Sequence, residues 1–295
     1  MHYVITGSLG NISQPIIKKL VENGHTVKVI SSNHNRVTEI EALGATASIG
    51  SVEDAAFLIT AFAGAYAIYT MVPPKWDAAD WKAHIALVGE NYAAAIKANN
   101  IKWVVNLSSI GAHKPGGVGP VSGLHRVENA LNNLEEVNVL HLRPGYFFSN
   151  FFANIGMIKH LGILGSNNEP NNEMILSDTS DIALAAADAL LALDFKGHTI
   201  KYLASDKRTP AEIASVLGKA VGIDALPWVT FTDEQNLAGM IQAGLPQEVA
   251  ANYTEMGVAM RTGEMAEDFY KQKRAVLGNV KLENFATVFA GAFNA

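Results

Sequence analysis

Short apolar segments alternate with segments of helical periodicity along most of the chain. Six apolar runs predict buried strands near residues 3–6, 26–31, 45–49, 66–72, 102–108 and 137–142. Between the fourth and fifth runs, residues 81–98 carry apolar side chains at helical spacing, and two asparagines follow as a stop signal. Strands that alternate with helices build a parallel sheet covered on both faces. We therefore predict an α/β fold in which the carboxyl ends of the strands, with their loops, share one edge of the sheet.

The pattern changes beyond residue 150 and becomes mainly helical. Helices are expected over 181–193 and 210–221, with a strand over 199–204 between them. We predict one domain over 1–150 and a smaller, mainly helical lobe over 151–295, of which about 174–205 returns to the first domain. The polar, glycine-containing segment 162–172 is expected to form a substrate lid.

The first predicted strand runs directly into a glycine turn, and a helix follows. Gly7 can adopt a positive φ, and Gly10 leaves no Cβ between the backbone and a bound pyrophosphate. The helix beyond presents free N–H groups and the positive end of its dipole. The spacing predicts a dinucleotide site made by Thr6, Gly7, Leu9, Gly10, Asn11 and Ile12. Because the third small residue is Ser13 rather than glycine, a tight turn without a nucleotide remains the alternative.

The end of the second predicted strand bears on which dinucleotide is bound. An acidic side chain there accepts hydrogen bonds from the ribose hydroxyls and repels a 2′-phosphate. This chain has Ser31, Ser32, Asn33 and Arg36 in that region, and its first carboxylate is Glu39. An arginine offers forked, charge-assisted hydrogen bonds to a phosphate. NADP is therefore the favoured cofactor and NAD is the other candidate; a solvated polar loop is the alternative interpretation.

Composition narrows the class of protein. The chain has 295 residues, of which 49% are hydrophobic and 17% charged, and this is enough to bury a substantial core. It contains no cysteine, which excludes disulfides and thiolate metal sites, and we expect no metal site. A net charge of −6 without a basic run disfavours nucleic-acid binding. The chain begins with a strand rather than a leader, and no uncharged run reaches the roughly 18 residues of a membrane span, so we expect a cytoplasmic protein.

Several segments together resemble the NmrA-like group of atypical short-chain dehydrogenases/reductases, and the resemblance spans nearly the whole chain. It rests on the glycine turn and on segments at 44–45, 104–109, 127–131, 142–147, 180–183 and 209–214. These include Leu142-Arg143-Pro144-Gly145 after the sixth strand and Ser180-Asp181-Ile182-Ala183 at the start of a helix. The resemblance implies a Rossmann-like domain, a smaller carboxyl-terminal lobe and a cleft between them. It also implies either an NAD(P)H-dependent reductase, including quinone reductases, or a cofactor-sensing regulator.

The chain departs from the family pattern at residues that matter for chemistry. Short-chain reductases use a Tyr-x-x-x-Lys pair, in which the lysine lowers the pKa of the tyrosine. No tyrosine lies between Tyr92 and Tyr146, and Leu124 aligns where relatives carry the lysine. Ser32 aligns with an arginine of many relatives, and Ser51 with an aspartate. The usual proton relay is therefore missing.

The remaining site candidates follow the ends of predicted strands. As further cofactor contacts we predict Met71, Val72, Ser108 and Tyr146. As substitutes for the missing acid we predict Ser109, His113 and His125, with a surface or helix-cap role as the alternative for the two histidines. Tyr146 and the phenylalanines after it either line the cleft or pack in the core.

The missing proton donor favours some hydride acceptors over others. A simple ketone becomes an alkoxide that needs a positioned acid, whereas a reduced quinone spreads its charge over a conjugated ring and can take a proton from water. General acid catalysis contributes roughly 10²- to 10⁴-fold, so its loss affects the first reaction far more. We therefore predict an NAD(P)H-dependent oxidoreductase that acts on a flat, activated small molecule such as a quinone or enone. The alternative is a non-catalytic redox sensor, which would bind a regulatory protein partner or form a homodimer.

Overall fold

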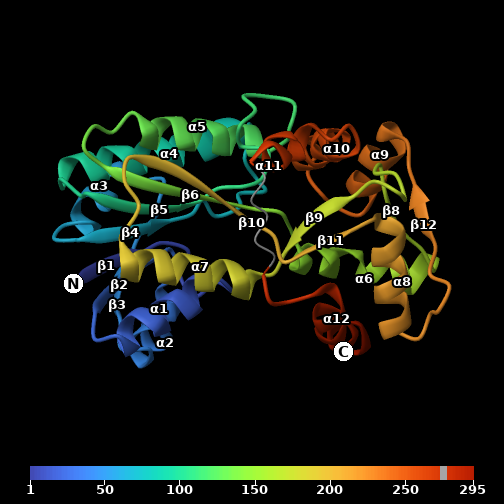
Figure 1. Ribbon diagram of the computed structural model, residues 1–295, viewed down its shortest axis with the longest axis horizontal. Coiled ribbons are helices and arrows are strands. Elements are labelled where there is room, and N and C mark those ends of the chain that lie inside the picture. Colours follow the sequence, from blue (N-terminus) through green and yellow to red (C-terminus); the bar gives the residue numbers. More distant parts are fainter. Residues whose placement is uncertain (273–277) are drawn as a thin grey trace.

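The computed structural model describes residues 1–272 and 278–295 and has a seven-stranded parallel sheet at its centre (Figure 1). The strand order is β10-β6-β5-β4-β1-β2-β3. The bounds are β1 (His2–Ile5), β2 (Thr26–Ser31), β3 (Thr46–Ile49), β4 (Ala67–Thr70), β5 (Trp103–Leu107), β6 (Asn138–Pro144) and β10 (His198–Leu203). The first six coincide with the six predicted strands. The predicted Rossmann-like sheet is confirmed.

Helices cover both faces of this sheet. One face carries α1 (Ser13–Glu22), η1 (His34–Arg36), α2 (Val37–Ala42) and α7 (Thr179–Ala192). The other carries α3 (Ala55–Ala61), α4 (Trp81–Ala98) and α5 (Val121–Asn132). The long helix α4 has the predicted bounds, and Asp80 caps it by accepting a hydrogen bond from the Ala83 backbone N–H.

The central strands are apolar on both sides because both of their faces are covered. In β1 the side chains of Tyr3 and Ile5 pack under α1 and α7, while Val4 packs on the opposite side with Leu58 and Val88. All of these side chains are fully buried. This two-sided packing makes the sheet a rigid base for the loops at its carboxyl edge.

The rest of the chain forms a smaller region beyond that edge. Its strands are β7 (Tyr146–Phe147), β9 (Met174–Ser177) and β11 (Asp206–Arg208) in one sheet, and β8 (Leu164–Ser166) and β12 (Trp228–Thr230) in another. Its helices are η2 (Phe148–Asn154), α6 (Ile155–Leu161), α8 (Pro210–Ala220), α9 (Asp233–Gln242), α10 (Gln247–Arg261), η3 (Glu264–Ala266), α11 (Glu267–Lys271) and α12 (Leu282–Asn294). Its core combines aliphatic side chains with a group of phenylalanines, in which Phe148 stacks on Phe285 at 5.4 Å between ring centroids.

The helix α7 and the strand β10 come after β7, β8 and β9 in the chain, but they lie on the central sheet. α7 packs against α1, and β10 pairs in parallel with β6 from His198 to Leu203. Asp181 at the start of α7 accepts hydrogen bonds from the Ser205 hydroxyl at 2.6 Å and from the backbone N–H groups of Asn279 and Val280. The Asp-Ile-Ala element therefore ties the segment before α12 to the central domain.

The prediction of a lid over residues 162–172 is wrong. β8 lies within this segment and pairs with β12, and Asn167 and Asn168 are buried. The Asn167 side-chain amide donates hydrogen bonds to Asp233 and to the Thr254 carbonyl. The Asn172 side-chain amide likewise donates to the Met260 carbonyl, so polar side chains of this segment bind other parts of the smaller region. Within the described ranges, no helix has the length and apolar character needed to cross a membrane.

Candidate active site

The site is built where the strand order of the central sheet reverses. β1 lies between β2 and β4, so the chain crosses to the other half of the sheet after β3. In open parallel sheets, ligands bind in the crevice outside the carboxyl ends of the strands at such a reversal. The turn between β1 and α1, the end of β2 and the ends of β4, β5 and β6 all open onto this edge.

The glycine turn has the geometry that its sequence predicts. Gly7 has φ +87°, and a Cβ there would lie 2.5 Å from the Ser13 hydroxyl oxygen. That hydroxyl donates a 2.9 Å hydrogen bond to the Thr6 carbonyl and closes the turn. Ser13 therefore replaces the usual third glycine with a side chain that stabilises the turn, and it makes Gly7 obligatory. At Gly10 an added Cβ would meet only the Gly7 carbonyl, at 3.1 Å.

The backbone donors of this turn point to an anion site. Leu9, Asn11 and Ile12 have N–H groups for which the described part of the chain supplies no acceptor. Gly10 and Asn11 are exposed, so the protein's own side chains do not fill the space above them. Free amides at the start of a ten-residue helix suit a diphosphate.

Thr6 and Met71 act together as a structural link below the turn. The Thr6 hydroxyl accepts a 2.8 Å hydrogen bond from the Met71 backbone N–H, and the Met71 carbonyl accepts one from the buried Tyr92 hydroxyl at 2.6 Å. These contacts fix the end of β4 beside the end of β1. They occupy the backbone of Met71, whose side chain, like Val72, lines the pocket described below.

The end of β2 presents an uncharged polar surface. The Ser31 hydroxyl accepts hydrogen bonds from the Ser8 hydroxyl and the Asn33 backbone N–H, while Ser32 and Asn33 are exposed. Arg36 lies in η1 and pairs with Glu39 at 2.9 Å. Exposed pairs of this kind are weak, so the guanidinium is available to a stronger anion.

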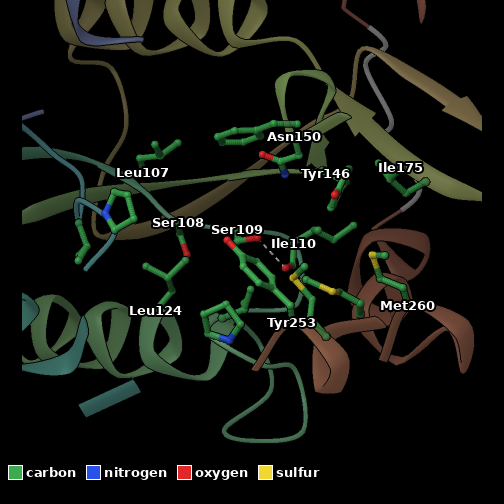
Figure 2. A pocket seen from close by; sticks show the side chains of 18 of the residues that line it. Leu107, Ser108, Ser109, Ile110, Leu124, Tyr146, Asn150, Ile175, Tyr253 and Met260 are labelled. Atoms are coloured by element: carbon green, nitrogen blue, oxygen red, sulfur yellow. Dashed lines mark hydrogen bonds between the residues drawn. The ribbon is translucent and has the colours of Figure 1, made fainter. Parts of the chain in front are cut away.

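An apolar pocket of about 320 Å³ lies at the ends of β4, β5 and β6 (Figure 2). Its walls come from the loop after β4, the loop after β5, α4, α5, β7 and β9, and from α10 and η3 of the smaller region. We call it the apolar pocket; its lining includes Met71, Val72, Pro73, Leu107, Ser108, Ser109, Ile110, Leu124, Tyr146, Asn150, Ile175, Tyr253, Met256, Met260 and Met265. Among its described lining residues Glu173 is the one charged side chain. The arrangement suits a flat, apolar molecule.

The two serines after β5 differ in what they bind. The Ser108 hydroxyl donates a 2.5 Å hydrogen bond to the buried Glu128 carboxylate. The Ser109 hydroxyl faces the pocket and donates to the adjacent Ile110 carbonyl at 2.9 Å, drawn as a dashed line in Figure 2. Ser108 is thus committed to the protein interior, whereas Ser109 can exchange its local bond for a ligand.

Two tyrosines bring phenol groups to the pocket. Burial raises the pKa of Tyr146, and burial likewise raises the pKa of Tyr253. No lysine or arginine lines the pocket among the described residues, and Leu124 on α5 stands at the position expected for the lysine. Both phenols therefore remain protonated and act as hydrogen-bond donors rather than as activated acids.

The structure does not bring the two predicted histidines into the pocket walls. His125 has its Nδ1 2.8 Å from the Ala112 carbonyl and its Nε2 3.0 Å from the Asn129 amide. His113 is partly buried, its two ring nitrogens have no partner within the described residues, and burial lowers its pKa. The structure thus unites Ser109 with Tyr146 and leaves both histidines outside.

The sequence interpretation missed the wall that α10 and η3 contribute. Tyr253, Met256, Met260 and Met265 all line the pocket. Met256 and Met260 are four residues apart and share a helix face, but methionine at helical spacing is more often core. A second missed feature is the buried ion pair of Glu128 and Arg143, whose spacing in the chain gives no sign of contact.

Comparisons with known proteins agree with this geometry. Residues 7–149 match a family model described as NAD(P)H-binding. The chain is 23% identical over 257 residues to the NAD(P)H azoreductase of Xenophilus azovorans, covering 86% of this chain and 85% of the relative.

Solved structures show the same fold over the whole chain. The NADPH-dependent quinone oxidoreductase QOR2 of Escherichia coli, solved with NADPH, has a TM-score of 0.81 at 19% identity, covering 97% of this chain and 99% of that one. The triphenylmethane reductase of Citrobacter sp. has a TM-score of 0.78 at 18% identity, covering 99% and 100%.

Proposed function

We propose that this chain is an NAD(P)H-dependent oxidoreductase that delivers hydride to a flat, conjugated acceptor such as a quinone or enone; the match of residues 7–149 to a family model described as NAD(P)H-binding supports this. Two parts of the resemblance expected from the sequence are confirmed: NAD(P)H binding by the family match, and the Rossmann-like fold by the structural neighbours. The observation that carries the acceptor proposal is the apolar, methionine-rich pocket beside the cofactor edge.

The protein's own groups account for cofactor binding. The free N–H groups of Leu9, Asn11 and Ile12 would hold the diphosphate, together with the dipole of α1. Gly10 has no Cβ and is exposed, so no side chain at this position keeps phosphate oxygens away from the backbone. A bound NAD(P)H would supply the hydride, and the protein would supply orientation and the exclusion of water.

We propose NADPH as the preferred cofactor. The end of β2 carries hydroxyl and amide groups with no carboxylate at the strand end, and Arg36 would exchange Glu39 for a 2′-phosphate. The structural neighbours from Escherichia coli and Citrobacter sp. are described with NADPH and NADP(H), respectively, which supports the same choice.

The acceptor class follows from what lines the apolar pocket. Met256, Met260 and Met265 offer a soft, adaptable wall that suits flat rings of different outline. The azoreductase, quinone oxidoreductase and triphenylmethane reductase among the relatives all bear names of conjugated acceptors, which supports this class.

Three hydroxyl groups of the apolar pocket are our candidates for hydrogen bonding to the acceptor. Ser109, Tyr146 and Tyr253 can donate hydrogen bonds to a developing oxyanion, and Ser109 is our candidate for direct contact with the acceptor. We assign no proton-transfer role to His113 or His125, since neither lines the pocket. A delocalised hydroquinone anion needs no strong acid and takes its proton from water, so these weak donors suffice.

The test is a spectrophotometric assay of NADPH and NADH oxidation with menadione, an enone, an azo dye, a triphenylmethane dye and an unactivated ketone. We expect oxidation above the buffer rate with the conjugated acceptors, NADPH ahead of NADH, and no turnover of the ketone. If the protein binds NADPH but oxidises it with none of the acceptors, the reductase proposal is overturned in favour of the redox sensor. A sensor would in turn require unequal affinity for NADPH and NADP⁺, or a change of oligomer or partner on binding.

A further inference from the structure

One wall of the apolar pocket is a short segment near the carboxyl terminus. η3 and α11 span residues 264–271, and Met265 and Ala266 line the pocket from this segment. Met265 is buried and packs on Gly111, where an added Cβ would lie 2.9 Å from the Met265 Cγ. The position of this segment therefore sets how far Met265 projects toward an acceptor.

Asp268 anchors the segment to the central domain. Its Oδ2 accepts a 3.2 Å hydrogen bond from the Arg143 guanidinium and a 2.5 Å one from the Tyr202 hydroxyl. Arg143 extends from the end of β6, and its side chain is only 5% exposed. Its guanidinium also donates to both oxygens of Glu128, at 3.0 and 2.6 Å. Because Glu128 fixes the guanidinium, Arg143 presents Asp268 with one preorganised, charged donor, and the Tyr202 hydroxyl supplies the other.

The other polar links of the segment are weaker. Lys114 pairs with Glu264 at 3.1 Å and Glu267 at 3.7 Å, and both carboxylates are about half exposed. Exposed ion pairs contribute little, while a pair to a buried, fixed guanidinium contributes more. Phe269 adds an edge contact to the Tyr202 ring at 5.6 Å between centroids. The Tyr270 hydroxyl also donates a 2.5 Å hydrogen bond to Glu173, but both of these side chains are about half exposed. Among the described polar links of this segment, Asp268 is thus the one that reaches a buried charged group of the central domain.

We propose that Asp268 is a positioning residue that holds Met265 against the apolar pocket and thereby makes the site selective for small acceptors over large ones. This inference rests on the proposed function, because it concerns the acceptor of that reaction. Asp268 touches neither the pocket nor a bound molecule, and it acts only through the segment that it anchors.

The experiment compares Asp268→Ala and Asp268→Asn with the wild type and with Lys114→Met, the matched control at the exposed end of the same segment. Steady-state kinetics with NADPH use menadione as the small acceptor and malachite green as the large one. For Asp268→Ala we expect the KM for menadione to rise about fivefold, or about 1 kcal/mol, with kcat changed less than about twofold. The KM for malachite green should stay level or fall, and Lys114→Met should behave as the wild type. Asp268→Asn keeps an oxygen for the Tyr202 hydroxyl and should be intermediate.

Two further measurements distinguish a failure of this inference from a failure of the proposed function and from misfolding of a variant. Calorimetric titration with menadione measures its affinity for each variant without turnover. If the wild type reduces no acceptor, the proposed function is overturned, but the calorimetric comparison still tests the role of Asp268. Hydrogen exchange of residues 264–271 should be faster in Asp268→Ala and unchanged in Lys114→Met. If Asp268→Ala does not fold, Asp268→Asn and Tyr202→Phe carry the comparison. Equal menadione affinity in wild type and folded variants, or an equal change for both acceptors, would overturn the inference.

Discussion

The buried His141 makes the stability of this protein depend on pH in a defined window. His141 on β6 is 1% exposed; Asn132 is 2.9 Å from its Nε2 and Asn106 is 3.1 Å from its Nδ1. The Thr70 hydroxyl donates to the Asn106 side-chain oxygen at 2.9 Å, so Asn106 turns its amide N–H₂ to the ring. The Nδ1 atom must therefore accept, and the ring is neutral in the folded protein.

The magnitude follows from the pKa. Burial is the main cause that lowers the pKa of His141, from 6.5 to about 4. The unfolded chain binds more protons than the folded one between these values, so stability is full above pH 6.5 and falls as the pH drops toward 4. At about 1.4 kcal/mol for each pKa unit, the full loss is about 3 kcal/mol, of which about 2 kcal/mol has occurred by pH 5.

The assay is urea unfolding at pH 7.5 and pH 5.0 for the wild type and for His141→Gln, which cannot titrate. We expect the wild type to lose about 2 kcal/mol more than the variant between the two pH values, because the other titrating groups are common to both proteins. The variant should be less stable at pH 7.5, since it loses packing and hydrogen-bond geometry. An equal loss in both proteins would refute the assignment of a neutral, buried His141 as the cause.

Three further predictions concern the cofactor edge and the buried ion pair. Gly10→Ala should weaken NADPH binding about tenfold, or about 1.4 kcal/mol, in a fluorescence titration. The control is Gly239→Ala, whose Cβ meets open space and which should bind NADPH as the wild type does. Equal NADPH binding by the two variants would argue against a diphosphate at the turn. Arg36→Ala should reduce the preference for NADPH over NADH about tenfold in kcat/KM, and an unchanged ratio would remove this residue from 2′-phosphate recognition. Glu128→Gln should lower the free energy of unfolding by about 3 kcal/mol, because the buried Arg143 guanidinium loses its charged partner. The control is Glu136→Gln in the exposed pair with Lys102, which should leave the midpoint of urea unfolding unchanged.

Local patterns were enough to predict the central sheet. Residues 81–98 have helical spacing and a clear stop, and inner strands such as β1 and β4 are buried on both faces, so these elements could be located without tertiary information. The glycine turn was equally local, because the positive φ of Gly7 and the close approach of the Gly7 carbonyl to Gly10 both arise within a few residues.

The pocket could not be predicted in the same way, since distant segments form its walls. Whether Met256 and Met265 face a core or a pocket depends on how α10 and η3 pack against β5 and β9, which their own spacing does not encode. The lid was predicted from polarity alone, yet Asn167 and Asn168 are buried, and the Asn167 amide donates hydrogen bonds to Asp233 and to the Thr254 carbonyl. Leu124, in contrast, was singled out by the resemblance of α5 to the family, and it lies in the pocket wall.

The central claim is that the free amides between β1 and α1 bind the diphosphate of NADPH. Isothermal titration calorimetry of the wild-type protein with NADPH tests this most directly. We predict saturable binding of one NADPH for each chain, with a Kd well below about 1 mM. Absence of binding heat for both NADPH and NADH at millimolar concentrations would contradict the account.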